Sequence, residues 1–122
     1  MAVKVLIVDD QEAFRAAARQ VLWAMDGFEI IGEVSTGEAS VEASRRLFPD
    51  LVLMDVNLPG IDGLEASRRI RAERSDVVVL LLSTYDREDF ASRIKSSGAS
   101  AFIPKESFSQ SSLLAAWLKA AG

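Results

Sequence analysis

The chain contains no cysteine and no histidine among its 122 residues. Without cysteine it can form no disulfide, no thiolate metal site and no cysteine nucleophile. Without histidine it lacks the commonest protein metal ligand, the usual general base and the Ser-His-Asp triad. Chemistry that passes through a phosphohistidine must therefore take that residue from a partner molecule.

Long apolar runs and an excess of basic charge are missing as well. The first apolar run is too short for a signal peptide and no later run reaches the length of a membrane span, so we expect a cytoplasmic protein with no membrane partner. Lysine and arginine number 14 against 18 aspartates and glutamates, which gives a net charge of −4. We expect no direct binding to nucleic acid, because such binding depends on basic charge.

What remains is the composition of an ordinary globular protein. Hydrophobic residues make up 49% of the chain and charged residues 26%, which is typical of neither a disordered nor a fibrous protein. A chain of this length can bury one substantial core, and it shows no internal repeat, low-complexity stretch or linker. We interpret residues 1–122 as one domain that includes no output domain.

Short apolar runs alternate along the chain with segments of helical periodicity. Strands are expected at 3–8, 28–34, 51–54, 77–82 and 101–103, and helices at about 14–25, 38–47, 64–74, 87–97 and 110–118. Strands that are apolar throughout are typical of parallel sheets buried on both faces. The alternation therefore predicts an α/β fold, with helices on both faces of a parallel sheet and right-handed crossovers.

Four polar features follow the predicted strands directly or nearly so. They are the pair Asp9-Asp10, then Asp55, Ser83 and Lys105. The carboxyl ends of parallel strands lie along one edge of a sheet, and ligands bind there at a switch point in the strand order. Residues that are distant in the sequence can therefore meet in one cleft.

The residue types in this predicted cleft suit phosphoryl chemistry with a hard metal ion. Three carboxylates repel each other unless a cation joins them, and oxygen ligands without histidine or cysteine favour Mg²⁺ over Zn²⁺. Asp55 stands alone after a short strand and is the best candidate for a nucleophile that becomes an aspartyl phosphate. Asp9 and Asp10 are better placed to hold the metal. The Lys105 ammonium and the Ser83 hydroxyl can each contact a phosphoryl oxygen.

Five segments together resemble the receiver domains of two-component response regulators. They are Leu-Ile-Val-Asp-Asp at 6–10, Asp-Val-Asn-Leu-Pro-Gly-Ile-Asp-Gly at 55–63, Leu-Leu-Ser-Thr-Tyr at 81–85, Gly-Ala at 98–99 and Phe-Ile-Pro-Lys at 102–105. The resemblance spans essentially the whole chain. It implies a flavodoxin-like, doubly wound sheet of five parallel strands in the order 2-1-3-4-5 with five helices. The third and fifth segments are most similar to receivers that carry a LuxR-type helix-turn-helix output.

The resemblance also implies roles for the residues around the metal. Asp55 would be the phosphoacceptor and a Mg²⁺ ligand. Asp10 would bind Mg²⁺ directly and Asp9 mainly through water, and the backbone carbonyl of Asn57 would be a further ligand. Lys105 would pair with the phosphoryl group. The phosphoryl donor would be a histidine of a sensor kinase or of a phosphotransfer protein.

The switch itself is expected at two further positions. By resemblance, the Ser83 hydroxyl would move toward the phosphoryl group and Phe102 would change rotamer with it, although Phe102 could equally be a plain core residue. The surface of the fourth helix, fifth strand and fifth helix would then change. Tyr85 is expected to screen the phosphoryl group from water. Apart from its own phosphorylation and dephosphorylation, the domain is not expected to be an enzyme.

Two other functions remain open at this point. A receiver-like domain that is never phosphorylated could serve only as a protein-interaction module. A Mg²⁺-dependent phosphatase with an aspartyl nucleophile commonly needs Asp-x-Asp, whereas this chain has Asp55-Val56-Asn57 and asparagine cannot transfer protons. The phosphorylated switch is therefore the favoured interpretation.

Several residues are assigned to structure instead. Asp62 is expected to cap the third helix. Trp23 and Trp117 are expected to pack between the first and last helices, or else to mark the face of a homodimer. The Lys105–Glu106 peptide bond is expected to be trans, since a non-proline cis bond costs about 3 kcal/mol.

Overall fold

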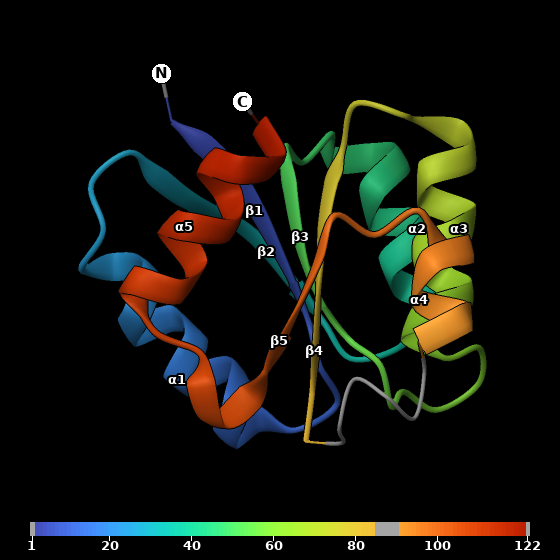
Figure 1. The fold of residues 1–122 in the computed structure, drawn as a ribbon, viewed down its shortest axis with the longest axis horizontal. Coiled ribbons are helices and arrows are strands. Elements are labelled where there is room, and N and C mark those ends of the chain that lie inside the picture. The colour runs from blue at the N-terminus through green and yellow to red at the C-terminus, as the bar shows by residue number, and fades with distance from the viewer. Residues whose placement is uncertain (1, 85–90, 122) are drawn as a thin grey trace.

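The computed structural model describes residues 2–84 and 91–121, which form one parallel sheet with the strand order β2-β1-β3-β4-β5 (Figure 1). The strands are β1 (Val3–Val8), β2 (Phe28–Val34), β3 (Leu51–Asp55), β4 (Val78–Ser83) and β5 (Ala101–Pro104). The helices are α1 (Glu12–Trp23), α2 (Gly37–Leu47), α3 (Gly63–Glu73), α4 (Ala91–Ser97) and α5 (Gln110–Ala121). The predicted fold class and strand order are both confirmed.

The sheet is covered on both faces. Helices α1 and α5 lie on one side, and α2, α3 and α4 lie on the other (Figure 1). Every residue of β3 and of β4 is buried. Because successive side chains of a strand point to opposite faces, Leu51 and Leu53 pack in the core under α1 and α5, while Val52 and Met54 pack in the opposite core. The apolar strands therefore hold the layers together, and polar chemistry is confined to the strand ends and the loops that follow them.

Short polar side chains begin two of the helices. Thr36 accepts a hydrogen bond from the Ala39 amide at 3.0 Å at the start of α2. Asp62 accepts one from the Glu65 amide at 2.9 Å and caps α3, as predicted. Such caps satisfy amides that the helix leaves unpaired and contribute about 1 kcal/mol each. They also fix where each loop from the carboxyl edge of the sheet ends.

Three strands end one residue later than the periodicity predicted. Asp55 is the last residue of β3 and pairs with Leu82, and Ser83 is the last residue of β4 and pairs with Pro104. Hydrogen bonding to the neighbouring strand decides these ends, and apolar periodicity does not report it. Asp55 and Ser83 therefore belong to the hydrogen-bonded sheet and not to the loops that follow.

The two tryptophans lie in different environments. Trp117 lies at the edge of the core, as predicted, and packs edge-on against Phe28 of β2, with ring centroids 6.3 Å apart. The prediction that Trp23 also belongs to this packing is wrong, because its side chain is 67% exposed. Trp23 follows the buried Leu22 on α1, and one residue turns a helix by about 100°. The buried face of α1 therefore ends one residue before Trp23.

Two smaller expectations concern the backbone and the lengths of the helices. The Lys105–Glu106 peptide bond is trans, as expected. Within residues 2–84 and 91–121, no helix is both long enough and apolar enough to cross a membrane.

Candidate functional site

The predicted site residues come together at the carboxyl edge of the sheet. Asp9 directly follows β1, Asp55 ends β3, Ser83 ends β4, and Lys105 follows β5. The register places Asp55 beside Leu82 and Ser83 beside Pro104. Ser83 therefore lies on the strand between those that carry Asp55 and Lys105. Strand order, with β1 next to β3, brings Asp9 to the other side of Asp55.

Three carboxylates form the centre of the site. Asp9, Asp10 and Asp55 each place a carboxylate oxygen within 4.8 Å of the others. Asp9 and Asp55 are buried, at 1% and 4% exposure, whereas Asp10 is exposed. The cluster therefore has two desolvated carboxylates and a third, Asp10, that is exposed to solvent. A ligand can approach from the side of Asp10.

Lys105 reaches this cluster from the end of β5. Its Nζ lies 2.6 Å from Asp9 Oδ2 and 3.6 Å from Asp55 Oδ1. The same ammonium lies 4.6 Å from the centroid of the Phe14 ring, which packs against Phe108. The aromatic face and the two carboxylates hold the cation in the site, and its shorter ion pair is with Asp9.

The surroundings of the cluster disfavour the ionised form of Asp55. Burial, followed by the charge of Asp9, raises the pKa of Asp55 from 3.8 to about 6, while Lys105 and the Asn57 amide act in the opposite direction. That amide donates to Asp55 Oδ1 at 3.3 Å. The Lys105 ammonium thus does not offset the burial of Asp55 together with the repulsion from its neighbouring carboxylates. An additional cation would.

The donor atoms fit a Mg²⁺ ion, which prefers a few carboxylates and keeps several waters. All three side chains of the cluster offer oxygen, and the exposed Asp10 leaves room for water. Among the described side chains, Asp9 Oδ2 is buried and accepts no hydrogen bond beside its ion pair with Lys105. A carboxylate oxygen with spare acceptor capacity, next to two others, is what a hard cation requires.

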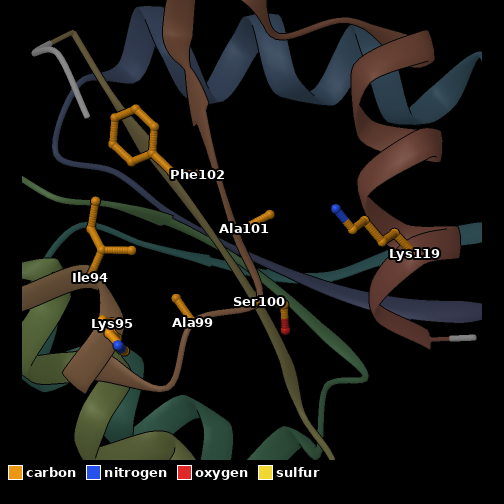
Figure 2. Close-up of a pocket in the computed structure, with 7 residues that line it drawn as sticks. All are labelled: Ile94, Lys95, Ala99, Ser100, Ala101, Phe102 and Lys119. Carbon is orange, nitrogen blue, oxygen red and sulfur yellow. The ribbon is translucent and has the colours of Figure 1, made fainter. Parts of the chain in front are cut away.

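The remaining predicted residues lie around this centre. Ser83 is fully buried. Phe102 is partly buried and packs against the core under α4, where it lines a cavity of about 440 Å³ between α4 and α5 (Figure 2). Asn57 follows Asp55 by two residues, and its backbone amide points toward that carboxylate. Tyr85, which the sequence placed beside the site, lies outside the described residues.

Sequence reasoning missed two residues that hold the loop after Asp55. A Cβ on Gly63 would collide with the Asp55 carbonyl oxygen, so only glycine permits this close approach. On α2, the Glu38 carboxylate accepts the Ile61 amide at 3.1 Å, and its hydrogen bonds to backbone amides lower the pKa of Glu38. The glycine stood in a recognised motif, but no sequence signal paired Glu38 with a loop more than 20 residues away.

Known proteins resemble this chain in both sequence and structure. Residues 5–117 match the model of the response regulator receiver domain, and the chain belongs to this family. It is 37% identical over 103 residues to the response regulator GacA of Pseudomonas syringae pv. syringae, and this covers 84% of the chain and 48% of GacA. The same identity and length relate it to UvrY of Escherichia coli, with 47% of UvrY covered. The chain thus spans about half the length of these curated relatives.

Solved structures agree with this assignment. A two-component response regulator of the LuxR family from an Aurantimonas species superposes with a TM-score of 0.85 at 27% identity, covering 94% of this chain and 81% of that one. A chain from the Borrelia burgdorferi complex of CheX, CheY, BeF₃ and magnesium superposes with a TM-score of 0.80 at 26% identity. It covers 94% of this chain and 86% of the other.

Proposed function

We propose that the chain is a phosphorylation-dependent switch in which Asp55 accepts a phosphoryl group from a histidine of a sensor kinase or phosphotransfer protein. The observation that carries the proposal is the meeting of Asp9, Asp10, Asp55 and Lys105 at one sheet edge, in a chain of the receiver family. Asp55 ends β3 within reach of both the acidic pair and the Lys105 ammonium, and we assign its carboxylate as the nucleophile. No residue of the chain can serve as the histidine donor.

Asp9, Asp10 and Asp55 would hold Mg²⁺, with the Asn57 carbonyl as a further ligand. When bound, the ion supplies positive charge that offsets the carboxylates and the incoming phosphoryl oxygens. The protein's own part is to position the groups. The backbone amide of Asn57 orients the Asp55 carboxylate, and Lys105 turns from Asp9 toward the new phosphoryl group. The Ser83 hydroxyl donates a hydrogen bond to a phosphoryl oxygen.

The signal leaves the site through β4 and β5. Ser83 pairs with Pro104, two residues after Phe102. When Ser83 moves toward the phosphoryl group, Phe102 changes rotamer, and the surface formed by α4, β5 and α5 changes with it. The cavity lined by Ile94, Phe102 and Lys119 lies on that surface (Figure 2). A partner or a second copy of the chain then distinguishes the two states.

The wider setting is proposed from the relatives. GacA and UvrY are response regulators about twice as long as the matched region. We place this chain in the same class of cytoplasmic two-component regulator, with transcription as the output of a longer protein and with residues 1–122 as the receiver. We expect the receiver to act only on its own phosphoryl group. We expect it to bind neither a membrane nor nucleic acid.

One experiment tests the switch against its alternatives. The chain is incubated with Mg²⁺ and acetyl phosphate, and its intact mass is measured over time beside that of Asp55→Asn. We expect one labile phosphoryl adduct that requires Mg²⁺ and is absent in Asp55→Asn. No adduct under any condition would leave a protein-interaction module. Rapid turnover of phosphate esters would instead indicate a phosphatase.

A further inference from the structure

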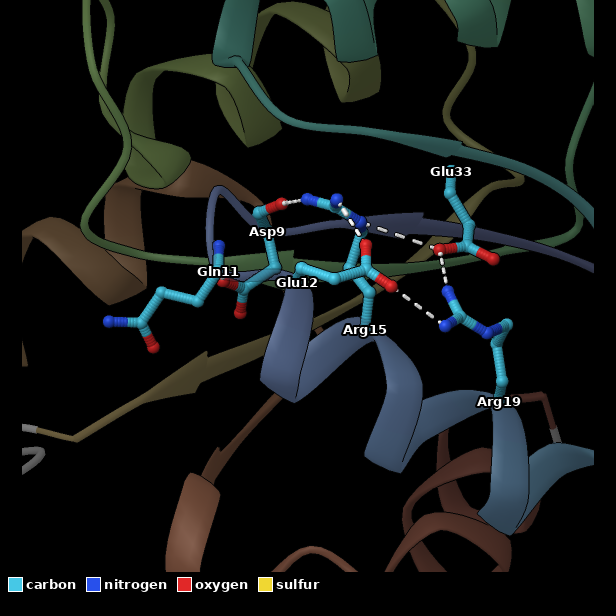
Figure 3. Close-up of polar contacts among 6 residues, drawn as sticks. All are labelled: Asp9, Gln11, Glu12, Arg15, Arg19 and Glu33. Atoms are coloured by element: carbon cyan, nitrogen blue, oxygen red, sulfur yellow. Dashed lines mark hydrogen bonds and ion pairs between the residues drawn. The ribbon is translucent and has the colours of Figure 1, made fainter.

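An arginine on α1 is hydrogen-bonded to the backbone that carries the acidic pair. Arg15 Nη1 donates to the carbonyl oxygen of Asp9 at 2.6 Å (Figure 3). The same guanidinium forms ion pairs with Glu12 at 2.5 Å and with Glu33 at 3.4 Å. Its side chain is only 18% exposed. Arg15 therefore joins the loop after β1 to two carboxylates outside the site.

Those two carboxylates are held in turn by a second arginine. Arg19 lies 2.6 Å from Glu33 and 2.8 Å from Glu12 (Figure 3). Glu12 belongs to α1 and Glu33 to β2, so the network ties the first helix to the edge strand. Within residues 2–84 and 91–121, the guanidinium of Arg19 bonds to these two glutamates and not to Asp9, which makes it a natural control for Arg15. Ion pairs that share partners restrict each other's geometry, and the fork of Arg15 is held in one orientation.

Asp9 is consequently held at three of its oxygens by three different groups. Its carbonyl accepts from Arg15, its Oδ1 accepts from the Gln11 amide at 2.8 Å, and its Oδ2 pairs with Lys105. Of these three, the bond from Arg15 is the one that holds the main chain itself. The adjacent Asp10 side chain is exposed, and its direction depends on that same main chain.

We propose that Arg15 is a positioning residue for the cation site: its hydrogen bond to the Asp9 carbonyl sets the direction in which Asp9 and Asp10 present their carboxylates. The inference rests on the proposed function, because it takes Mg²⁺ to be the ligand. Groups that orient metal ligands commonly change metal affinity by about tenfold or more when removed. Arg15 fills this place without contacting the metal position.

The sign of the effect separates positioning from simple electrostatics. Arg15 is a cation close to three carboxylates. If only its charge mattered, removing it would tighten Mg²⁺ binding, because a repulsive charge would be lost. If it positions Asp9 and Asp10, removing it weakens binding. Arg19→Ala removes the same charge and breaks contacts with the same two glutamates, but leaves the Asp9 carbonyl bonded.

Mg²⁺ affinity is therefore measured by isothermal titration for the parent chain, Arg15→Ala and Arg19→Ala at one ionic strength. We expect Arg15→Ala to bind about tenfold more weakly than the parent, and Arg19→Ala to remain within about twofold of it. Unchanged or tighter binding by Arg15→Ala overturns the inference while the proposed function stands. A parent chain that binds no Mg²⁺ overturns the proposed function and the inference with it.

A second measurement needs no metal. Hydrogen exchange of the Gln11 backbone amide, which donates to Asp9 Oδ1, is followed in EDTA. Arg15→Ala should exchange this amide faster than the parent, because the main chain of Asp9 is held less firmly, with Arg19→Ala close to the parent; equal rates in all three proteins contradict the inference. Arg15→Lys replaces Arg15→Ala if the latter does not fold. Lysine keeps the charge and can itself donate to a carbonyl, so binding close to that of the parent, with slow Gln11 exchange, supports positioning by the hydrogen bond, and binding tighter than that of the parent overturns it.

Discussion

The two ends of the central strands carry polar residues that behave in opposite ways. At the amino end, Asp50 accepts the Lys4 amide at 2.9 Å, and Arg71 donates to the Val77 carbonyl at 2.7 Å. At the carboxyl end, Asp9 and Asp55 are buried beside each other, and the pKa of Asp55 is raised to about 6. One end satisfies its own backbone, and the other gathers like charges.

The difference shows how one scaffold separates stability from function. Polar groups at the amino end exchange hydrogen bonds with main-chain atoms that are already present, so they contribute to folding whether or not a ligand arrives. The carboxylates at the other end are left mutually repelling until an external cation joins them. The contrast can be tested by changing single residues at each end.

The largest expected effect on stability comes from adding a methyl group at Gly63, next to the Asp55 carbonyl. Gly63→Ala should lower the free energy of unfolding by about 3 kcal/mol, measured by urea denaturation, because the new Cβ meets the Asp55 carbonyl and backbone atoms cannot yield easily. Elsewhere in a helix, the same exchange is favourable by about 1 kcal/mol. A cost below about 1 kcal/mol would show that the carboxyl edge adapts more readily than its packing indicates.

A matched glycine lies at the opposite end of the sheet. Gly27 precedes β2 with a φ of +84°, and none of the described residues comes within 4 Å of the place where a Cβ would lie. Gly27→Ala should therefore cost only the strain of a left-handed residue, about 1 kcal/mol. Equal costs at the two positions would remove the distinction between close approach and backbone strain.

The next effect is a gain in stability when charge is removed from the site. A rise of the Asp55 pKa from 3.8 to about 6 means that the folded chain binds the proton more tightly than the unfolded chain. Stability should therefore fall as pH rises through this window and stay lower above it. In EDTA, Asp55→Asn should gain about 2 kcal/mol of folding stability at about pH 8, where the parent carboxyl is ionised. This is less than the full pKa shift implies, because solvent screens part of it, and the gain should be close to nothing at about pH 3.5.

The measurement is urea unfolding of both proteins across that pH range. Mg²⁺ added at the alkaline end should stabilise the parent chain and leave Asp55→Asn nearly unaffected, since the variant lacks the third carboxylate. A gain that is the same at both pH values would mean that the ionisation of the buried Asp55 carboxyl is not its source.

The smallest effect belongs to the amino end. Asp50→Ala should cost about 1 kcal/mol, because the Lys4 amide loses its acceptor in a position that water can partly reach. Its Mg²⁺ affinity should equal that of the parent chain within about twofold, as judged by titration. A marked loss of Mg²⁺ affinity would show that the two ends are coupled through the sheet.

Much of the fold and site could be predicted from local sequence patterns. Apolar runs such as 51–54 and the intervening helical periodicity reported the α/β alternation, and the polar residues after each run marked the functional edge. Asp62 was assigned correctly because a cap is a local interaction. Trp23 was not, since one step of helical rotation decided between core and solvent.

Contacts between distant loops could not be predicted in the same way. Glu38 reaches the Ile61 amide, and Arg15 reaches the Asp9 carbonyl while sharing Glu33 with Arg19. None of these partners has a distinctive sequence signal, because a charged residue at a helix start is ordinarily a solvated one. Their roles depend on which loops the strand order places side by side.

The sequence by itself determined the residue types of the site and their place after successive strands, because periodicity and composition are local properties of the chain. Only the tertiary structure decided that Lys105 pairs more closely with Asp9 than with Asp55, that Gly63 lies against the Asp55 carbonyl, and that Arg15 holds the backbone of Asp9. These features arise from distances between segments far apart in sequence, and packing of the sheet and its two helical layers sets those distances.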